Sequence, residues 1–154
     1  MTTYEKSDPK TIQALFGSIA KRYDVTNSIL SFQLHRLWNS RLVDEMRKEK
    51  NPEILLDLWA GTGDIAFNFL KKSCSPSKAL LLDFCPQMLE CAKEKMASNR
   101  IEKHHTIDFI QGDAQELPLP KCSVDAVTIA YGIRNVKEPA RCVAETFRVL
   151  KAGG

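Results

Sequence analysis

The chain has 154 residues, of which 44% are hydrophobic and 27% are charged, a composition typical of one globular domain with a buried core. Its 22 basic and 19 acidic residues give a formal net charge of +3, which is too small to indicate a nucleic-acid partner. The five cysteines include no Cys-x-x-Cys pair, so we expect reduced thiols and neither disulfides nor a bound metal. The N-terminus lacks the apolar core of a signal peptide, and no apolar run approaches the ~20 residues of a membrane span, so we expect a cytoplasmic protein.

Two helices are expected before the first strand. After Asp8-Pro9, apolar side chains four residues apart predict an amphipathic helix that includes Leu15, Ile19 and Tyr23. A second helix is predicted from about residue 34 to residue 48. It should end before Asn51-Pro52, because the residue before a proline disfavours the helical conformation. Its predicted apolar side consists of Leu34, Leu37, Trp38, Leu42 and Met46. We interpret residues 1–50 as an N-terminal helical cap on a core formed by residues 51–154.

From Ile54 onward the chain alternates short apolar strands with helices, as a parallel α/β sheet requires. The predicted strands are residues 54–58, 79–83, 107–111 and 124–131. The predicted helices are residues 64–72, 86–98 and 138–150. For the last helix we predict an inner side formed by Val143, Phe147 and Leu150. We therefore expect an α/β fold with a mostly parallel sheet.

The predicted core is organised around a glycine loop after its first strand. The apolar run 54–58 is followed by Gly61-Thr62-Gly63, which gives a tight turn before a helix that opens at Asp64. Glycine at two positions leaves no β-carbon in the way, so a ligand can lie against the backbone near the helix N-terminus. A strand, a glycine loop and a helix in this order predict a site for a nucleotide-like ligand.

Two cofactors fit this loop. Gly61-x-Gly63-x-x-Ala66, with Asp83 twenty residues after Gly63, satisfies the loose dinucleotide fingerprint, so an NAD-type oxidoreductase is one hypothesis. Asp57, four residues before Gly61, favours S-adenosylmethionine, because a carboxylate attracts a sulfonium and an α-amino group and repels a pyrophosphate. We favour S-adenosylmethionine and keep the dinucleotide as an alternative.

Polar residues follow the other predicted strands at the edge of the sheet where ligands bind in such folds. Asp83 is placed to accept hydrogen bonds from both hydroxyls of a ribose. Asp113 can take an exocyclic amine, and the backbone of Ala114 can face an adenine edge. After the fourth strand, Arg134 and Asn135 can bind and polarise an oxygen atom. Each carboxylate alone could instead be a helix cap or a turn residue, and the last pair could lie in a solvated loop.

Two stretches resemble the ubiquinone/menaquinone biosynthesis C-methyltransferase family. Residues 23–38, YDVTNSILSFQLHRLW, look like the family's Tyr-Asp-x-Met-Asn and Ser-x-x-x-His-x-x-Trp signature. Residues 132–136, GIRNV, followed by RVLKAGG at 148–154, are similar to a second family-specific stretch. The match covers nearly all of the sequence, although the loop around Gly61 is shared by many methyltransferases. It implies a class I S-adenosylmethionine-dependent methyltransferase fold, which is Rossmann-like and mostly parallel with an N-terminal helical cap.

The resemblance also implies roles for individual residues. By that resemblance, Thr62, Asp83, Asp113 and Ala114 occupy positions that the family uses for S-adenosylmethionine. To these cofactor-binding candidates the residue pattern adds Gly61 and Gly63 of the loop and Asp57 of the first strand. Arg134 and Asn135 match the pair proposed in the family to help deprotonate the quinol. No metal is implied.

The implied activity is transfer of a methyl group from S-adenosylmethionine to a ring carbon of a polyprenylated quinol, of either the menaquinone or the ubiquinone pathway. Because that substrate resides in the membrane, we expect peripheral contact at its inner face through the cap. Association with a second copy or with other quinone-biosynthesis proteins is left open. Thr26 stands where methionine is usual, Ala152 stands where proline is usual, and the family's later strands are missing. We therefore expect a C-terminally truncated chain with an unpaired edge on its fourth strand, for which an inactive or cofactor-binding-only fragment is the alternative.

Overall fold

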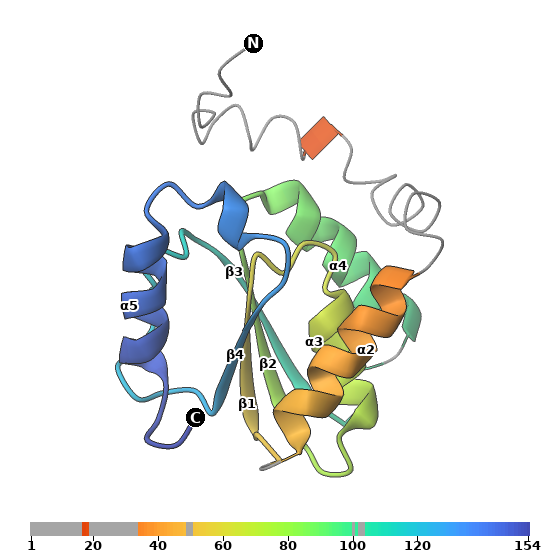
Figure 1. The fold of residues 1–154 in the computed structure, drawn as a ribbon. Helices are drawn as coiled ribbons and strands as arrows, with labels where there is room; N and C mark the ends of the chain where they lie inside the picture. The colour runs from red at the N-terminus through yellow and green to blue at the C-terminus, as the bar shows by residue number, and fades with distance from the viewer. Residues whose placement is uncertain (1–16, 19–33, 49–50, 100, 102–103) are drawn as a thin grey trace.

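The computed structural model describes residues 17–18, 34–48, 51–99, 101 and 104–154. Its centre is a four-stranded sheet in the order β3-β2-β1-β4, in which every pair of neighbours is parallel (Figure 1). The strands are β1 (Ile54–Leu58), β2 (Lys78–Asp83), β3 (Thr106–Gln111) and β4 (Ala126–Ile129). The parallel α/β fold expected from the sequence is confirmed.

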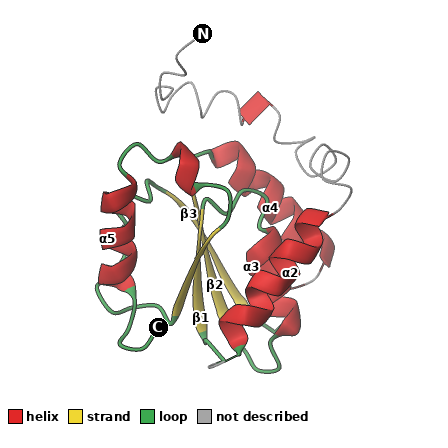
Figure 2. Cartoon of the chain, viewed as in Figure 1, coloured by secondary structure: helices red, strands yellow, loops and turns green. Residues whose placement is uncertain are grey.

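Helices cover both faces of this sheet (Figure 2). The helices are α2 (Leu34–Arg47), α3 (Asp64–Lys72), α4 (Pro86–Asn99) and α5 (Pro139–Val149), with a 3-10 turn η2 (Ile133–Asn135). Helices α2, α3 and α4 contribute to one buried apolar cluster and α5 to another. Successive side chains of β1 point to opposite faces, so Leu55 belongs to the first cluster while Leu56 and Leu58 belong to the second.

The predicted bounds agree with these elements to within one residue, except at β4. The sequence predicts a strand over residues 124–131, whereas β4 covers only Ala126–Ile129. Val124 forms an isolated parallel bridge with Leu150 outside the strand. At the other end, Tyr131 has a φ of 62°, which is incompatible with an extended strand.

The apolar side predicted for the second helix is wrong in part, because Met46 packs against the first core cluster but Leu34, Leu37, Trp38 and Leu42 are exposed. Helix α2 turns His35, Asn39 and Val43 inward, while Leu37 and Trp38 are 61% and 53% exposed. Polar contacts fix this orientation, because Lys72 of α3 donates hydrogen bonds to Ser40 and pairs with Asp44 at 2.6 Å. The helix therefore packs on the first core cluster through Val43 and Met46, with the polar contacts to Lys72 beside them.

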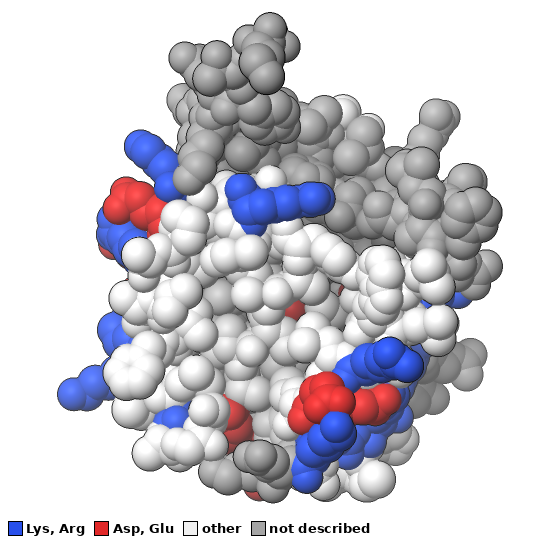
Figure 3. All heavy atoms as spheres, viewed as in Figure 1, with Lys and Arg blue, Asp and Glu red and all other residues white. Residues whose placement is uncertain are grey.

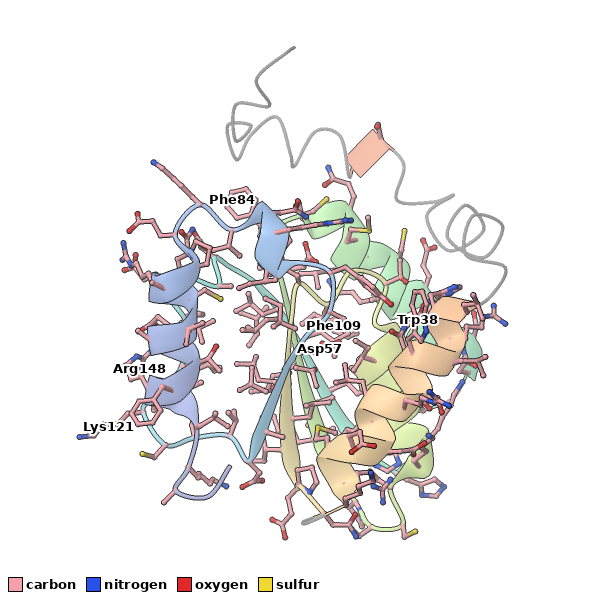
Figure 4. The ribbon with its side chains drawn as sticks, viewed as in Figure 1. Trp38, Asp57, Phe84, Phe109, Lys121 and Arg148 are labelled. Carbon is pink, nitrogen blue, oxygen red and sulfur yellow. The ribbon has the colours of Figure 1, made fainter. Side chains whose placement is uncertain are left out.

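The inner side predicted for the last helix is also wrong in part. Val143 and Phe147 of α5 are exposed, and Cys142 and Val149 are buried instead. Arg148 explains the rotation, because its guanidinium donates hydrogen bonds to the backbone carbonyls of Leu117 and Leu119 and pairs with Glu145 of the same helix. Figure 4 shows Arg148 on α5, across the sheet from Trp38 on α2.

One edge of the sheet is open. Within the described residues, β4 pairs only with β1, as the sequence predicted for the fourth strand. An open groove of about 680 Å³ runs beside it, lined by residues of β4, of α2 and of the C-terminal turn. Figure 3 shows that this face of the molecule is largely uncharged, with charged side chains gathered over the lower part of α2.

Several predictions concern residues outside the described part of the chain. Of the first predicted helix, only Gly17 and Ser18 are described, and both are helical. The Tyr23 end of the family signature and the boundary at residue 50 lie outside the described residues, so the division into cap and core stays a prediction. Among the helices that are described, none is both long and apolar enough to cross a membrane.

Candidate functional site

The carboxyl ends of the four parallel strands meet at one edge of the sheet, where the glycine loop lies between β1 and α3. Gly61 and Gly63 have φ values of 55° and 83°, in the left-handed region that favours glycine. A β-carbon at Gly63 would lie 2.7 Å from Cε2 of Phe67, so this position also lacks space for a side chain. Apart from its chain neighbours, a β-carbon at Gly61 would meet no atom of the described residues within 4 Å. Within the described part of the chain, the backbone at Gly61 therefore leaves space that a ligand can approach.

Asp83, at the end of β2, holds this loop in place. Its Oδ2 accepts a hydrogen bond of 2.8 Å from the backbone N–H of Gly61, and its Oδ1 accepts one of 2.8 Å from the N–H of Cys85. Burial raises the pKa of the Asp83 carboxyl, and these backbone N–H groups oppose the rise. An ionised carboxylate offers about four lone-pair sites, so Asp83 can hold the loop and still accept hydrogen bonds from a ligand.

Asp57 is buried inside the sheet (Figure 4). Its Oδ1 accepts a hydrogen bond of 2.8 Å from the hydroxyl of Thr128 on β4. Its Oδ2 is buried and has no hydrogen-bond partner among the residues that the structure describes. Burial raises the pKa of Asp57 to about 7, against the lowering effects of Thr128 and the backbone N–H of Ala66. A cation brought near this carboxyl would favour its ionised form.

The Thr62 hydroxyl is tied to a lysine that the sequence analysis did not single out. Lys95 of α4 donates a hydrogen bond of 3.0 Å to Oγ1 of Thr62 and pairs with Oδ1 of Asp64 at 2.6 Å. It thus joins α4 to the glycine loop and to the first turn of α3. Right-handed crossovers between consecutive strands place α3 and α4 on the same face of the sheet. This rule could have identified Lys95 as a polar residue of α4 that can reach α3.

The loop after β3 is tied to the start of α5. Oδ1 of Asp113 accepts a hydrogen bond from the backbone N–H of Gln115, and both carboxylate oxygens lie 3.0 Å from its Nε2. Gln115 in turn accepts a hydrogen bond of 2.7 Å from the N–H of Glu138. Ala114 is buried in the second core cluster. In the structure, Asp113 is thus a turn residue, and a role for Asp113 and Ala114 in cofactor binding stays a prediction.

Arg134 and Asn135 lie in the 3-10 turn η2, after the end of β4. The Arg134 side chain is exposed and makes no hydrogen bond or ion pair with the described part of the chain. The backbone N–H of Asn135 donates a hydrogen bond of 2.9 Å to the carbonyl of Gly132. A β-carbon at Gly132 would lie 2.4 Å from Cβ of Trp59, which places this turn against the glycine loop. The structure therefore brings the predicted catalytic pair to the same edge of the sheet as Gly61 and Asp83.

Comparison with known proteins identifies the family. The family model described as the ubiE/COQ5 methyltransferase family matches residues 3–154. The chain belongs to the ubiE/COQ5 methyltransferase family. The resemblance found in the sequence is thereby confirmed.

Curated relatives in this family carry names from quinone biosynthesis. The chain is 47% identical over 154 residues to a demethylmenaquinone methyltransferase of Protochlamydia amoebophila, covering 100% of this chain and 63% of that protein. It is 44% identical over 144 residues to the ubiquinone/menaquinone biosynthesis C-methyltransferase UbiE of Methylobacterium nodulans, covering 93% of this chain and 56% of that one. The chain thus spans about three fifths of the length of these relatives.

Solved structures described as methyltransferases share the fold. A putative S-adenosyl-L-methionine-dependent methyltransferase from Methanococcus maripaludis matches with a TM-score of 0.74 and 22% identity, covering 100% of this chain and 64% of that one. A SAM-dependent methyltransferase from Aquifex aeolicus matches with a TM-score of 0.70 and 20% identity, covering 88% of this chain and 67% of that one. The parallel sheet of this family member is therefore the class I, Rossmann-like methyltransferase fold predicted from its sequence.

Proposed function

We propose that this protein transfers the methyl group of S-adenosylmethionine to a ring carbon of a polyprenylated quinol. The names of its curated relatives support this reaction, and both the menaquinone and the ubiquinone pathway are represented among them. The observation that carries the proposal is the glycine loop, whose Gly61 backbone no described side chain covers while Asp83 fixes its N–H. Such a loop presents backbone to a ligand at the edge where this fold binds its cofactors.

The residues at the site fit S-adenosylmethionine. The free lone pairs of Asp83 suit the two hydroxyls of a ribose, and Asp113 and Ala114 lie at the next strand end for an adenine. Asp57 has a buried oxygen without a partner among the described residues, so a nearby sulfonium or ammonium would compensate it. Bound there, S-adenosylmethionine supplies a methyl group on a positively charged sulfur.

Arg134 and Asn135 act on the quinol in this proposal. A phenol with an ordinary pKa of about 10 is almost entirely neutral at pH 7, and its ring carbon becomes a better nucleophile when the hydroxyl loses its proton. The exposed guanidinium of Arg134 stabilises the phenolate, and Asn135 holds the oxygen or a water. The ring carbon then forms a bond to the methyl group as the sulfur–methyl bond breaks, and the ring proton leaves to solvent.

A transfer assay tests this function. The chain is mixed with S-adenosylmethionine that carries a labelled methyl group and with a demethylated polyprenylated quinol, and the label is measured in the extracted quinol. We expect labelled quinol and an equal amount of S-adenosylhomocysteine. Binding without transfer would contradict the proposed activity and favour the cofactor-binding-only alternative. Tight binding of NAD in place of S-adenosylmethionine would favour the oxidoreductase.

The proposal includes peripheral contact with the inner face of the cytoplasmic membrane through α2. Its exposed apolar stripe consists of Leu34, Leu37, Trp38 and Leu42. Arg36 and Arg41 stand beside the stripe on the same helix and are exposed. Apolar side chains flanked by cations suit a membrane surface that contains anionic lipid.

Vesicle flotation tests this surface. We expect the wild-type chain to float with vesicles that contain anionic lipid, and Leu37→Glu to reduce the floating fraction. Phe147→Glu is the matched control, because Phe147 is also exposed and apolar but lies on α5. Equal losses in the two variants, or no flotation of the wild type, would contradict a contact through α2. Sedimentation of the same variants distinguishes this contact from self-association through the stripe.

A further inference from the structure

Two residues with large side chains adopt the left-handed conformation where β1 and β4 end. The two strands are paired, with Leu58 opposite Ile129. Trp59 follows β1 and has a φ of 54°, and Tyr131 follows β4 and has a φ of 62°. This conformation is unfavourable for any residue with a β-carbon, so its surroundings must hold it in place.

Gly132 is the residue that meets Trp59. Its φ of −76° and ψ of −32° lie in the right-handed helical region, which any residue can adopt. Space decides the residue type instead, because a β-carbon at Gly132 would lie 2.4 Å from Cβ and 2.5 Å from Cγ of Trp59. The backbone at Gly132 thus rests directly on the Trp59 side chain.

The turn that bears Arg134 is built from this contact. The carbonyl of Gly132 accepts the N–H of Asn135 at 2.9 Å, and the carbonyl of Ile133 accepts the N–H of Val136 at 3.2 Å. Val136 is buried in the second core cluster, and Trp59 packs against the same cluster. The turn is therefore supported at one end by Trp59 and at the other by the core.

Trp59 is also joined through Ala60 to the glycine loop. The next residue, Ala60, donates its N–H to the carbonyl of Leu82 on β2 at 3.1 Å and accepts the N–H of Gly63 at 2.8 Å. We infer that Trp59 is a positioning residue that couples the glycine loop to the turn bearing Arg134 and Asn135. This role rests on the proposed function, in which the loop holds the cofactor and the turn acts on the quinol. A cofactor that orders the glycine loop then also orders, through Trp59, the turn that bears Arg134 and Asn135.

Hydrogen exchange at the backbone N–H of Asn135 tests the contact between Trp59 and Gly132 without any ligand. Gly132→Ala should speed this exchange by roughly tenfold in the wild-type background, within the range of coupling found for residues in contact. Trp59→Gly removes the clashing side chain and accepts the left-handed φ, so Gly132→Ala should have little further effect in that background. Trp59→Phe keeps Cβ and Cγ and should preserve the protection. Equal effects of Gly132→Ala in both backgrounds would overturn the contact.

Urea unfolding confirms that each variant is folded. If Gly132→Ala does not fold, the inference is tested by comparing Trp59→Gly with Trp59→Phe. Only Trp59→Gly should lose hydrogen-exchange protection at the backbone N–H of Asn135. Equal protection in the two would overturn the inference.

Adding S-adenosylmethionine tests the coupling itself. The chain has two tryptophans, so Trp38→Phe leaves Trp59 to report on the loop by fluorescence. We expect the cofactor to change its emission and to slow exchange at Asn135, and Trp59→Gly to abolish the slowing. Binding by calorimetry without any change at Asn135 overturns the coupling and leaves the proposed function standing. Absence of binding instead contradicts the proposed function, while the ligand-free comparison still decides the contact.

Discussion

The carboxylate of Asp83 accepts a hydrogen bond of 2.8 Å from the backbone N–H of Gly61, which joins the end of β2 to the glycine loop after β1. The other carboxylate oxygen, Oδ1, accepts a hydrogen bond of 2.8 Å from the backbone N–H of Cys85. A single side chain thereby fixes the loop geometry and presents an acceptor beside the open face of Gly61. The cofactor site proposed for this member of the ubiE/COQ5 family depends on that arrangement.

Replacing Asp83 should therefore weaken both the fold and the site. Asp83→Ala leaves the N–H groups of Gly61 and Cys85 without their acceptor, so the free energy of unfolding should fall by about 1–3 kcal/mol. S-Adenosylmethionine should bind at least roughly tenfold more weakly, because the acceptor for the ribose is lost as well. Urea unfolding and calorimetry measure the two effects. Asp108→Ala is the control, since Asp108 lies on β3 and pairs only at the surface with Lys78. Similar losses in both variants would contradict the role of Asp83.

Asp57 should make stability fall as the pH rises. Burial raises its pKa from 3.8 to about 7 in the folded chain. Between these values the folded state binds the proton more tightly than the unfolded state does. The contribution of Asp57 is then fully present below pH 3.8 and is lost as the pH rises through about 7. Asp57→Asn keeps an acceptor for Thr128 without this titration, so its unfolding free energy relative to the wild type should be higher at pH 8 than at pH 5. A pH-independent difference between the two proteins would contradict the raised pKa.

The same carboxyl links cofactor binding to proton release. A sulfonium or ammonium near Asp57 favours its ionised form, so S-adenosylmethionine should release protons when it binds at pH 6. Calorimetry in two buffers with different ionisation enthalpies counts these protons. The released fraction should disappear in Asp57→Asn. An unchanged proton count in that variant would place the released proton elsewhere.

Lys95 should contribute to cofactor affinity through the glycine loop. Lys95→Met removes its contacts with Thr62 and Asp64, so the loop loses a support and S-adenosylmethionine should bind roughly tenfold more weakly. Lys95→Arg should retain part of the affinity. Lys93→Met is a matched control on the same helix, because Lys93 pairs with Glu90 at the surface. An effect of Lys93→Met as large as that of Lys95→Met would indicate a general effect of charge.

Arg134 should affect turnover and leave cofactor binding nearly unchanged. Arg134→Ala removes the cation proposed to stabilise the phenolate, so the turnover rate should fall by on the order of a hundredfold or more. The dissociation constant of S-adenosylmethionine should change little, because the Arg134 side chain is exposed and makes no hydrogen bond or ion pair with the described loop residues. Arg141→Ala serves as the control, since Arg141 is exposed on α5. A large loss of cofactor affinity in Arg134→Ala would contradict this assignment.

The strands, apart from the ends of β4, and the edge of the sheet where the candidate site residues lie could be predicted from the sequence. Residues 54–58 form a short apolar run before Gly61, and β1 has the predicted bounds. Because parallel strands end at one edge of a sheet, the spacing alone brings Asp83 and Arg134 to the same edge as the loop. These inferences need only local pattern and the general rules of α/β folds.

The contacts between elements could not be predicted in the same way. The apolar stripe of α2 suggested a buried side, but the Lys72 contacts turn it outward. The hydrogen bonds from Arg148 to the backbone carbonyls of Leu117 and Leu119 rotate α5 so that Phe147 is exposed. Lys95 and Trp59 owe their roles to neighbours that are distant in the sequence. Helical periodicity shows which residues share a side, but it does not show what that side meets.

The most direct test of the central claim is calorimetric titration of the 154-residue chain with S-adenosylmethionine, with circular dichroism on the same sample. We predict saturable binding near one site per chain, to a cooperatively folded α/β protein, with much weaker binding of NAD. Absence of binding to a chain that is folded by circular dichroism would contradict the cofactor site at Gly61 and Asp83.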